Sequence, residues 1–254
     1  RDVLDVVSEH VRIVHNRMNT LLIHRADLIA CFDHDDPAQG TEWRGASLFA
    51  RDGFIEWIGP AADLPHDLQQ ADEVIDARGQ LVVPGLVITH HHMFQSLTRA
   101  VPGVQDAELF AWLRGLYPIW SRLTPEMVRV STQVAMAELM RSGCSTTSDH
   151  LYLFPNGARL DDSIEAARGM GMRFVATRGS MSVGQSAGGL PPDALVERED
   201  HILRDSQRLI ETWHDPRPGS MLNVALAPCS PFSVSPDLMR ESAALARSFR
   251  GQGV

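Results

Sequence analysis

The chain has 254 residues, of which 44% are hydrophobic and 22% charged, a composition typical of globular proteins. This length suits one α/β barrel domain or two smaller domains. The formal net charge of -9 argues against nucleic acid or an anionic membrane as partner, because no basic face is available to neutralise phosphates. No apolar run approaches the roughly 18–20 residues that a membrane-spanning helix needs.

The three cysteines, Cys31, Cys144 and Cys229, are far apart and form no Cys-x-x-Cys pair. Their odd number and spacing exclude a disulfide framework and a cysteine zinc knuckle. The first residues show no secretory signal. These observations favour a reducing compartment, and we expect a cytoplasmic protein.

The chain before residue 81 divides into two segments. Residues 1–17 are charged and weakly amphipathic, whereas Met18 begins a run that resembles a natural start, so we expect the first 17 residues to precede the native initiator. In residues 18–80 short β-like runs alternate with turns, which predicts a small β-sandwich domain. Its strands are expected over residues 20–23, 28–32, 46–50, 54–58 and 73–75, with a hairpin turn at Arg51-Asp52-Gly53.

Residues 81–254 follow a rhythm of strand, loop and helix. Strands are expected over residues 82–90, 144–150, 172–177 and 221–227. Helices are expected over residues 125–141, 162–169, 192–213 and 236–247, the first capped by Thr124 and the last by Ser235. We expect the helix over residues 125–141 to present the apolar stripe Met127, Val130, Val134, Ala137 and Leu139 to the core.

Alternating strands and helices imply a parallel sheet, in either a doubly wound fold or a (β/α)₈ barrel. No Gly-x-Gly-x-x-Gly follows the first strand, which removes the simplest dinucleotide-binding interpretation. Histidines at the carboxyl end of the first strand lie where barrel enzymes keep their chemistry. Because a complete barrel takes about 250 residues, we expect the first half of a metal-dependent barrel, truncated after about four β/α units.

The segment 84–92 holds the strongest chemical signal, since an apolar strand ends on three consecutive histidines. Alternate side chains of a strand share a face, so His90 and His92 point the same way and His91 points the other way. Two imidazoles at this spacing can hold one transition metal. Without other evidence, a run of histidines can also have a structural role, lie in a solvated loop or occur by chance.

Several motifs together resemble a known superfamily. They include Pro-Gly-Leu-Val-x-x-His-x-His at residues 84–92, and the segments 95–99, 112–113, 116–126, 142–150, 152–155, 177–182, 188–192 and 227–233. This pattern, which runs from about residue 20 to 247, resembles the amidohydrolase superfamily. More narrowly, it is similar to the branch that deaminates or dechlorinates purines and triazines.

The resemblance implies one divalent metal, Zn²⁺ by preference, held by His90 and His92, a histidine on the fifth strand and an aspartate on the eighth. A fifth-strand glutamate and a sixth-strand histidine would move protons. His201 and His214 are expected on or beside the long helix as solvated side chains, and no His-x-His-x-x-Glu pattern is present. The catalytic residues are therefore expected beyond Val254, and this chain is expected to be an inactive fragment.

The implied reaction attacks the purine C2 and turns 8-oxoguanine into urate and ammonia. The alternatives are an aminohydrolase or chlorohydrolase of guanine or hydroxy-triazines, or a non-catalytic truncated remnant. The expected partners are a small heterocyclic substrate and, through an exposed apolar barrel edge, further copies of the chain in a homo-oligomer.

Four more residues are candidates for substrate binding: Gln95, Trp112, His150 and Cys229. Gln95 would offer amide hydrogen bonds to a planar ring, and Trp112 would either stack on that ring or belong to the core. His150 would contact substrate or form a hydrogen bond behind the metal site, whereas Cys229 is by default a buried thiol. Strand alternation turns the neighbouring Asp149 away from the site.

Overall fold

The computed structural model describes residues 19–34, 36 and 40–249. The expected N-terminal segment 1–17 and Met18 lie outside these residues. The chain divides into two compact units, Arg1–Gly85 and Leu86–Val254, which are described separately. None of the described helices has both the length and the apolar character needed to cross a lipid bilayer.

The first unit contains one five-stranded sheet with mixed strand directions. Its strands are β1 (Thr20–Ala30), β2 (Glu42–Arg51), β3 (Phe54–Pro60), β4 (Glu73–Asp76) and β5 (Leu81–Val82). The order is β3-β2-β1-β4, and β5 also pairs with β1. Asp52 and Gly53 both have positive φ angles, as the tight turn predicted between β2 and β3 requires.

Two expectations for this unit need correction. The two strands expected at residues 20–23 and 28–32 are one strand, because an irregularity between Ile23 and Ala26 shifts the pairing without ending it. Arg25 adopts a positive φ of 61° at this irregularity. The expected β-sandwich is also wrong for the described residues, which form one sheet rather than two stacked sheets.

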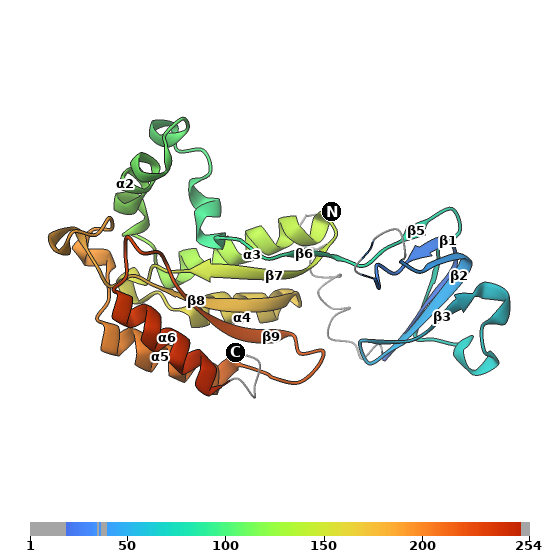
Figure 1. The fold of residues 1–254 in the computed structure, drawn as a ribbon. Coiled ribbons are helices and arrows are strands. Elements are labelled where there is room, and N and C mark those ends of the chain that lie inside the picture. Colours follow the sequence, from blue (N-terminus) through green and yellow to red (C-terminus); the bar gives the residue numbers. More distant parts are fainter. Residues whose placement is uncertain (1–18, 35, 37–39, 250–254) are drawn as a thin grey trace. The chain divides into compact units, whose positions relative to one another are not determined.

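The second unit contains a four-stranded parallel sheet covered by helices (Figure 1). Its strands are β6 (Leu86–Ile88), β7 (Cys144–Leu151), β8 (Arg173–Ser180) and β9 (Leu222–Pro228). Its α-helices are α2 (Leu109–Trp120), α3 (Pro125–Arg141), α4 (Leu160–Met170), α5 (Glu199–Trp213) and α6 (Pro236–Ser248). The strands are neighbours in chain order, so the order does not reverse as it does in a doubly wound sheet.

The strand expected over residues 82–90 is divided between the two units. Leu81 and Val82 pair with β1, and the second sheet begins at Leu86 after Pro84 and Gly85. Proline lacks the N–H that a sheet needs, which explains the interruption. The strand then ends at Ile88, so the histidines follow the strand instead of belonging to it.

The helix caps follow the sequence closely. The Thr124 hydroxyl accepts a hydrogen bond from the Met127 amide at 3.3 Å, and the Ser235 hydroxyl accepts one from the Leu238 amide at 3.0 Å. Each cap residue is followed by proline, whose fixed φ suits the first helical position. Helix α2 was not predicted; it lies beyond the carboxyl ends of the strands and contains Pro118 (Figure 1).

The helix expected over residues 192–213 is shorter than predicted. A 3₁₀ turn, η8 (Asp193–Leu195), is separated from α5 by an extended segment. In that segment the Glu197 amide donates to the Met181 carbonyl at 2.9 Å. The Glu197 carboxylate also accepts from the buried Arg178 at 2.9 Å. Both bonds hold Glu197 against β8, which prevents the helix from starting earlier.

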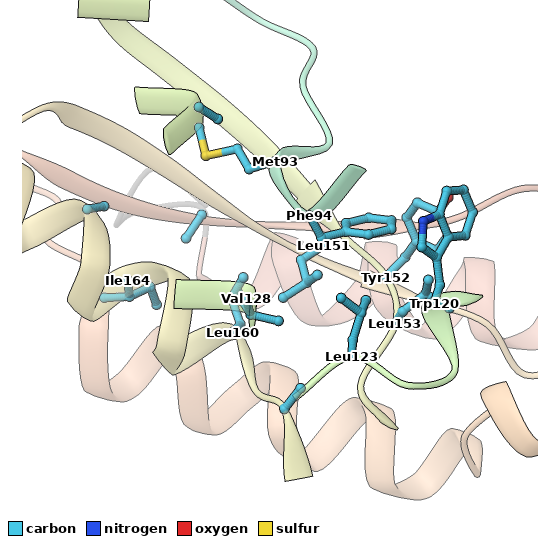
Figure 2. Close-up of a cluster of buried hydrophobic side chains, with 14 of the residues drawn as sticks. Met93, Phe94, Trp120, Leu123, Val128, Leu151, Tyr152, Leu153, Leu160 and Ile164 are labelled. Carbon is cyan, nitrogen blue, oxygen red and sulfur yellow. The ribbon is translucent and has the colours of Figure 1, made fainter. Parts of the chain in front are cut away.

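The main core lies where helices α3 and α4 and the segment after β6 pack against β7 and β8. Figure 2 shows Phe94, Tyr152 and Trp120 at one end of this core and Leu160 and Ile164 at the other. The Phe94 ring makes edge contacts with Trp120 and Tyr152, with centroids 5.1 and 5.4 Å apart. This aromatic packing supports the segment that directly follows the three histidines.

The stripe expected to face the core from α3 is wrong for three of its five residues, whereas Leu139 is partly buried and packs against the core. Met127, Val130 and Val134 are 44%, 43% and 45% exposed, and the buried face contains Val128, Ser131, Thr132, Ala135 and Met136 instead. The small side chains let α3 approach α4 closely, and the hydroxyls of Thr132 and Ser163 lie 3.0 Å apart in that contact. The close approach of α3 to α4 therefore explains why the less hydrophobic face of α3 is the buried one.

This correction predicts unequal costs for substitutions at two positions of α3 that are two residues apart and lie on different faces. Met136→Ala should lower the free energy of unfolding by about 2–5 kcal/mol, because Met136 is fully buried and its loss leaves a cavity. Val134→Ala should change it by less than about 0.5 kcal/mol, as for other exposed positions. Urea unfolding of both variants tests the assignment, and a reversed order of stabilities would contradict it.

A charged cluster joins α4 to α5. The Arg208 guanidinium donates two hydrogen bonds to the Asp161 carboxylate at 2.9 and 2.7 Å, and the Trp213 indole donates a third at 3.0 Å. Burial alone would raise the pKa of Asp161, but these hydrogen bonds from Arg208 and Trp213 lower it to about 2.

We expect Asp161→Asn to cost about 2 kcal/mol of stability at pH 7, the value of a carboxyl pKa lowered by this amount. A lowered native pKa stabilises the fold above the unfolded pKa of about 4, and that stabilisation is lost as the pH falls toward 2. The difference from the parent should therefore shrink between pH 5 and pH 2.5 in urea unfolding. Asp200→Asn, in a solvent-exposed ion pair with Arg204, is the control and should change little.

Candidate metal and substrate site

The three histidines lie in the connection between β6 and the 3₁₀ helix η4 (Met93–Thr98). The imidazole rings of His90 and His92 are neighbours, with centroids 4.9 Å apart and planes at 89°. His90 is exposed and His92 is half-buried. The pair expected from strand alternation is thus brought together, although neither residue belongs to the strand.

Among the described residues, the hydrogen bond of the His92 ring uses one nitrogen, Nδ1, and leaves the other without a hydrogen-bond partner. Its Nδ1 lies 2.8 Å from the carbonyl oxygen of His150, on the next strand. Because a carbonyl oxygen only accepts, Nδ1 carries the proton and Nε2 keeps its lone pair. Burial lowers the pKa of His92, which favours the neutral ring. A neutral imidazole whose other nitrogen donates to a carbonyl is the usual state of a metal-bound histidine.

The pair borders an open hollow of about 470 Å³. Its wall is formed by His90, His91, His92, Gln95, Ser96, Thr98, Arg99 and Trp112. Four of the six predicted site residues therefore meet at one hollow: His90, His92, Gln95 and Trp112. Its volume lies in the range of small-molecule sites.

Gln95 and Trp112 give the hollow an amide and an aromatic surface. The Gln95 side-chain amide donates to the Tyr152 hydroxyl at a long 3.4 Å, and the Tyr152 ring lies edge-on to His92 with centroids 5.4 Å apart. Trp112 is half-buried and contacts Trp120, with centroids 5.3 Å apart. Trp112 thus both borders the hollow and packs on the core.

His150 and Cys229 lie behind the hollow rather than in its wall. The ring of His150 is 5.3 Å from that of His92, and its Nε2 donates to the Ala227 carbonyl at 2.9 Å. Burial lowers the pKa of His150 to about 4. Cys229 follows β9 and packs on the main core, and burial raises the pKa of its thiol. Both residues border the same end of the sheet as the histidine pair.

Sequence reasoning missed two residues that support this site. Tyr152 contacts both Gln95 and His92, and its position two residues after His150, just beyond the end of β7, was the available signal. Asp149 is buried, and its Oδ1 accepts from the Met93 amide at 2.7 Å. Its turn away from His150 agrees with strand alternation, but its hydrogen bond to the segment after the histidines could not be foreseen.

The residues present fit a transition metal in part. Two adjacent imidazoles supply nitrogen ligands of the type that zinc prefers. Within the described residues, however, no three His, Cys, Asp or Glu side chains form a group that could hold a metal ion. The described residues therefore supply two ligands of a zinc coordination shell that usually has four.

Comparison with known proteins agrees with this geometry. A family model described as the amidohydrolase family matches residues 81–251. The 8-oxoguanine deaminase of Pseudomonas aeruginosa is 47% identical over 213 residues, covering 82% of this chain and 46% of the relative. The hydroxydechloroatrazine ethylaminohydrolase of Pseudomonas sp. strain ADP is 39% identical, covering 82% of this chain and 45% of the relative.

A solved structure shows the same fold. The atrazine chlorohydrolase of Arthrobacter aurescens TC1, complexed with zinc, superposes with a TM-score of 0.83 at 28% identity, covering 91% of this chain and 51% of that chain. The chain thus spans about half the length of the relatives it matches. The family model covers most of the second unit, including the histidine pair and the hollow beside it. The chain therefore belongs to the amidohydrolase family.

Proposed function

We propose that these residues form the metal-binding and part of the substrate-binding site of an aminohydrolase that converts 8-oxoguanine to urate and ammonia. The observation that carries the proposal is the His90–His92 pair at the edge of a hollow shared with Gln95 and Trp112. The 47% identity to an 8-oxoguanine deaminase supports the choice of substrate.

We further propose that β6 to β9 are the first four strands of a (β/α)₈ barrel. Four parallel strands in unbroken chain order, with helices between them, support this architecture. Relatives about twice as long as this chain agree with it. The remaining metal ligands and the acid–base residues would then come from the other half of the barrel.

The proposed cofactor is one divalent metal, Zn²⁺ by preference, held by His90 and His92. Such an ion, when bound, would supply Lewis-acid activation of water at neutral pH. The chain's own residues would orient the substrate. Trp112 would cover one face of the purine, and the Gln95 amide, oriented by Tyr152, would hydrogen-bond to its polar edge.

A hydroxy-triazine is the second candidate substrate. The 39% identity to a hydroxydechloroatrazine ethylaminohydrolase favours it, and the open hollow beside Trp112 would accept any planar heterocycle. Guanine would fit by the same argument.

A chimera tests the proposal. Residues 19–249 would replace the matching part of the Pseudomonas aeruginosa 8-oxoguanine deaminase, and ammonia release would be followed with 8-oxoguanine, guanine and a hydroxy-triazine. We expect release from 8-oxoguanine, at a rate well above that of the same chimera carrying His92→Ala. Preference for the triazine would favour the second candidate, and a folded, zinc-loaded chimera without any activity would contradict both.

A further inference from the structure

Three hydrogen bonds join the histidine segment to two consecutive residues of β7. The His150 amide donates to the His91 carbonyl at 2.8 Å, and the His92 Nδ1 donates to the His150 carbonyl at 2.8 Å. The Met93 amide donates to the Asp149 carboxylate at 2.7 Å. The first two use backbone acceptors that any residue supplies, so Asp149 is the only one of the three acceptors that depends on a side chain.

The Asp149 carboxylate is in an environment that opposes its charge. The residue is 1% exposed, and its second oxygen, Oδ2, has no hydrogen-bond partner among the described residues. Burial raises the pKa of Asp149 to about 7. A buried polar atom without a partner costs about 1–3 kcal/mol, and such atoms are uncommon in native proteins. The burial of the Asp149 carboxylate therefore costs folding free energy, while the carboxylate accepts a hydrogen bond from one backbone amide.

The position of that amide connects Asp149 to the metal site. The Met93 nitrogen belongs to the peptide bond directly after His92, so Asp149 fixes the backbone that carries the His92 ring. The His150 carbonyl fixes the ring itself through Nδ1. Because both the backbone after His92 and the His92 ring are held by hydrogen bonds, the Nε2 atom points in one fixed direction. A shift of the backbone at Met93 would move the ring away from the His150 carbonyl, and nothing would then favour the proton on Nδ1 over Nε2.

We propose that Asp149 is a positioning residue that holds His92 with Nδ1 protonated and Nε2 available, and so sets the affinity of the histidine pair for a divalent metal. The second part rests on the metal site proposed above, whereas the first concerns the metal-free chain. The competing explanation is that Asp149 only stabilises the end of β7, in which case its loss would lower stability without changing the state of the His92 ring.

The metal-free chain tests the first part directly. Ring-nitrogen NMR of the parent should show His92 with the proton on Nδ1, and hydrogen exchange should show a protected Met93 amide. Asp149→Ala removes the acceptor, so we expect a mixture of His92 tautomers and at least tenfold faster exchange at Met93. Asp149→Asn keeps the Oδ1 acceptor and should preserve the parental tautomer, even though its new amide donor lowers stability.

Zinc titration of the same 254-residue proteins tests the second part. Loss of the residue that orients a metal ligand typically costs 10–100-fold in affinity, and we expect a loss of this size for Asp149→Ala. Asp149→Asn should bind within about threefold of the parent. Thr147→Val is the matched control, because Thr147 is equally buried on the same face of β7 and has no bond to the histidine segment.

The outcomes separate this proposal from the proposed function. A folded Asp149→Ala variant with the parental His92 tautomer and zinc affinity would overturn the positioning role. If that variant does not fold, the parent and Asp149→Asn still decide, since an unprotected Met93 amide or a different His92 tautomer in either one would also overturn it. A parent that keeps the Nδ1 tautomer but binds no zinc would refute the metal site and the affinity claim while leaving the positioning of His92 intact.

Discussion

Replacing His92 with alanine is expected to weaken zinc binding by about 100-fold, or about 2.7 kcal/mol. The ring of His92 lies 4.9 Å from that of His90 and has its Nδ1 bonded to the His150 carbonyl, so it contributes one imidazole of the pair proposed to bind the metal. Its removal leaves a single ligand, which cannot chelate. Equilibrium dialysis followed by metal analysis of the purified chain would measure the effect.

The adjacent histidine provides a matched control for this experiment. His91 lies between the pair in the sequence and also borders the hollow, but the ring contact of the pair joins His90 to His92 without it. Burial is the main cause of its lowered pKa, followed by the charge of Arg99. His91→Ala should therefore leave zinc affinity within about threefold, since its backbone carbonyl still accepts from His150. Equal losses of zinc affinity in His91→Ala and His92→Ala would show that the three histidines bind metal without the specific pairing of His90 with His92.

Substituting alanine for Gly179 is expected to lower the free energy of unfolding by about 3 kcal/mol, the upper end for overpacking a core. A Cβ at this position would lie 2.5 Å from the Tyr152 Cβ, and 2.7 Å from both the Leu151 carbonyl and the His150 Nε2. Two of these neighbours are a backbone atom and a Cβ, which cannot rotate away. The added methyl group would also push the His150 ring from its bond to Ala227.

Gly169 is the matched control, because it is exposed in α4 and a Cβ there would meet nothing within 4 Å. Gly169→Ala should raise stability by about 0.5–1 kcal/mol through helix propensity. Thermal and urea unfolding of both variants give the comparison. Similar stabilities for the two alanine variants would rule out the tight contact between β8 and the site.

The local features of the fold could be predicted from the sequence. The alternation of strands and helices after residue 81, the caps at Thr124 and Ser235, and the turn at Asp52 and Gly53 are all present. Each depends on a few neighbouring residues and on backbone chemistry that acts over one turn. Such local features form in the folded protein as predicted because they do not depend on contacts with residues far away in the sequence.

Element boundaries and buried faces could not be predicted in the same way. Met127, Val130 and Val134 of α3 are exposed because α4 packs against a different face of the helix, at Thr132. Helix α5 begins late because Arg178 and Met181 hold Glu197 in an extended segment. In both cases a contact between residues far apart in the sequence outweighed local propensity.

The sequence alone determined that His90 and His92 would meet and that Gln95 lies close behind them, since these residues are within five positions of one another. Only the tertiary structure decided that Trp112 joins them at the hollow, while the ring of His150 and the thiol of Cys229 stay behind it. It also decided that Asp149 and the His150 carbonyl hold the segment in place. The physical reason is that these hydrogen bonds and packing contacts depend on the register between strands and on how deeply each side chain is buried. Both are set by pairing with residues far away in the sequence.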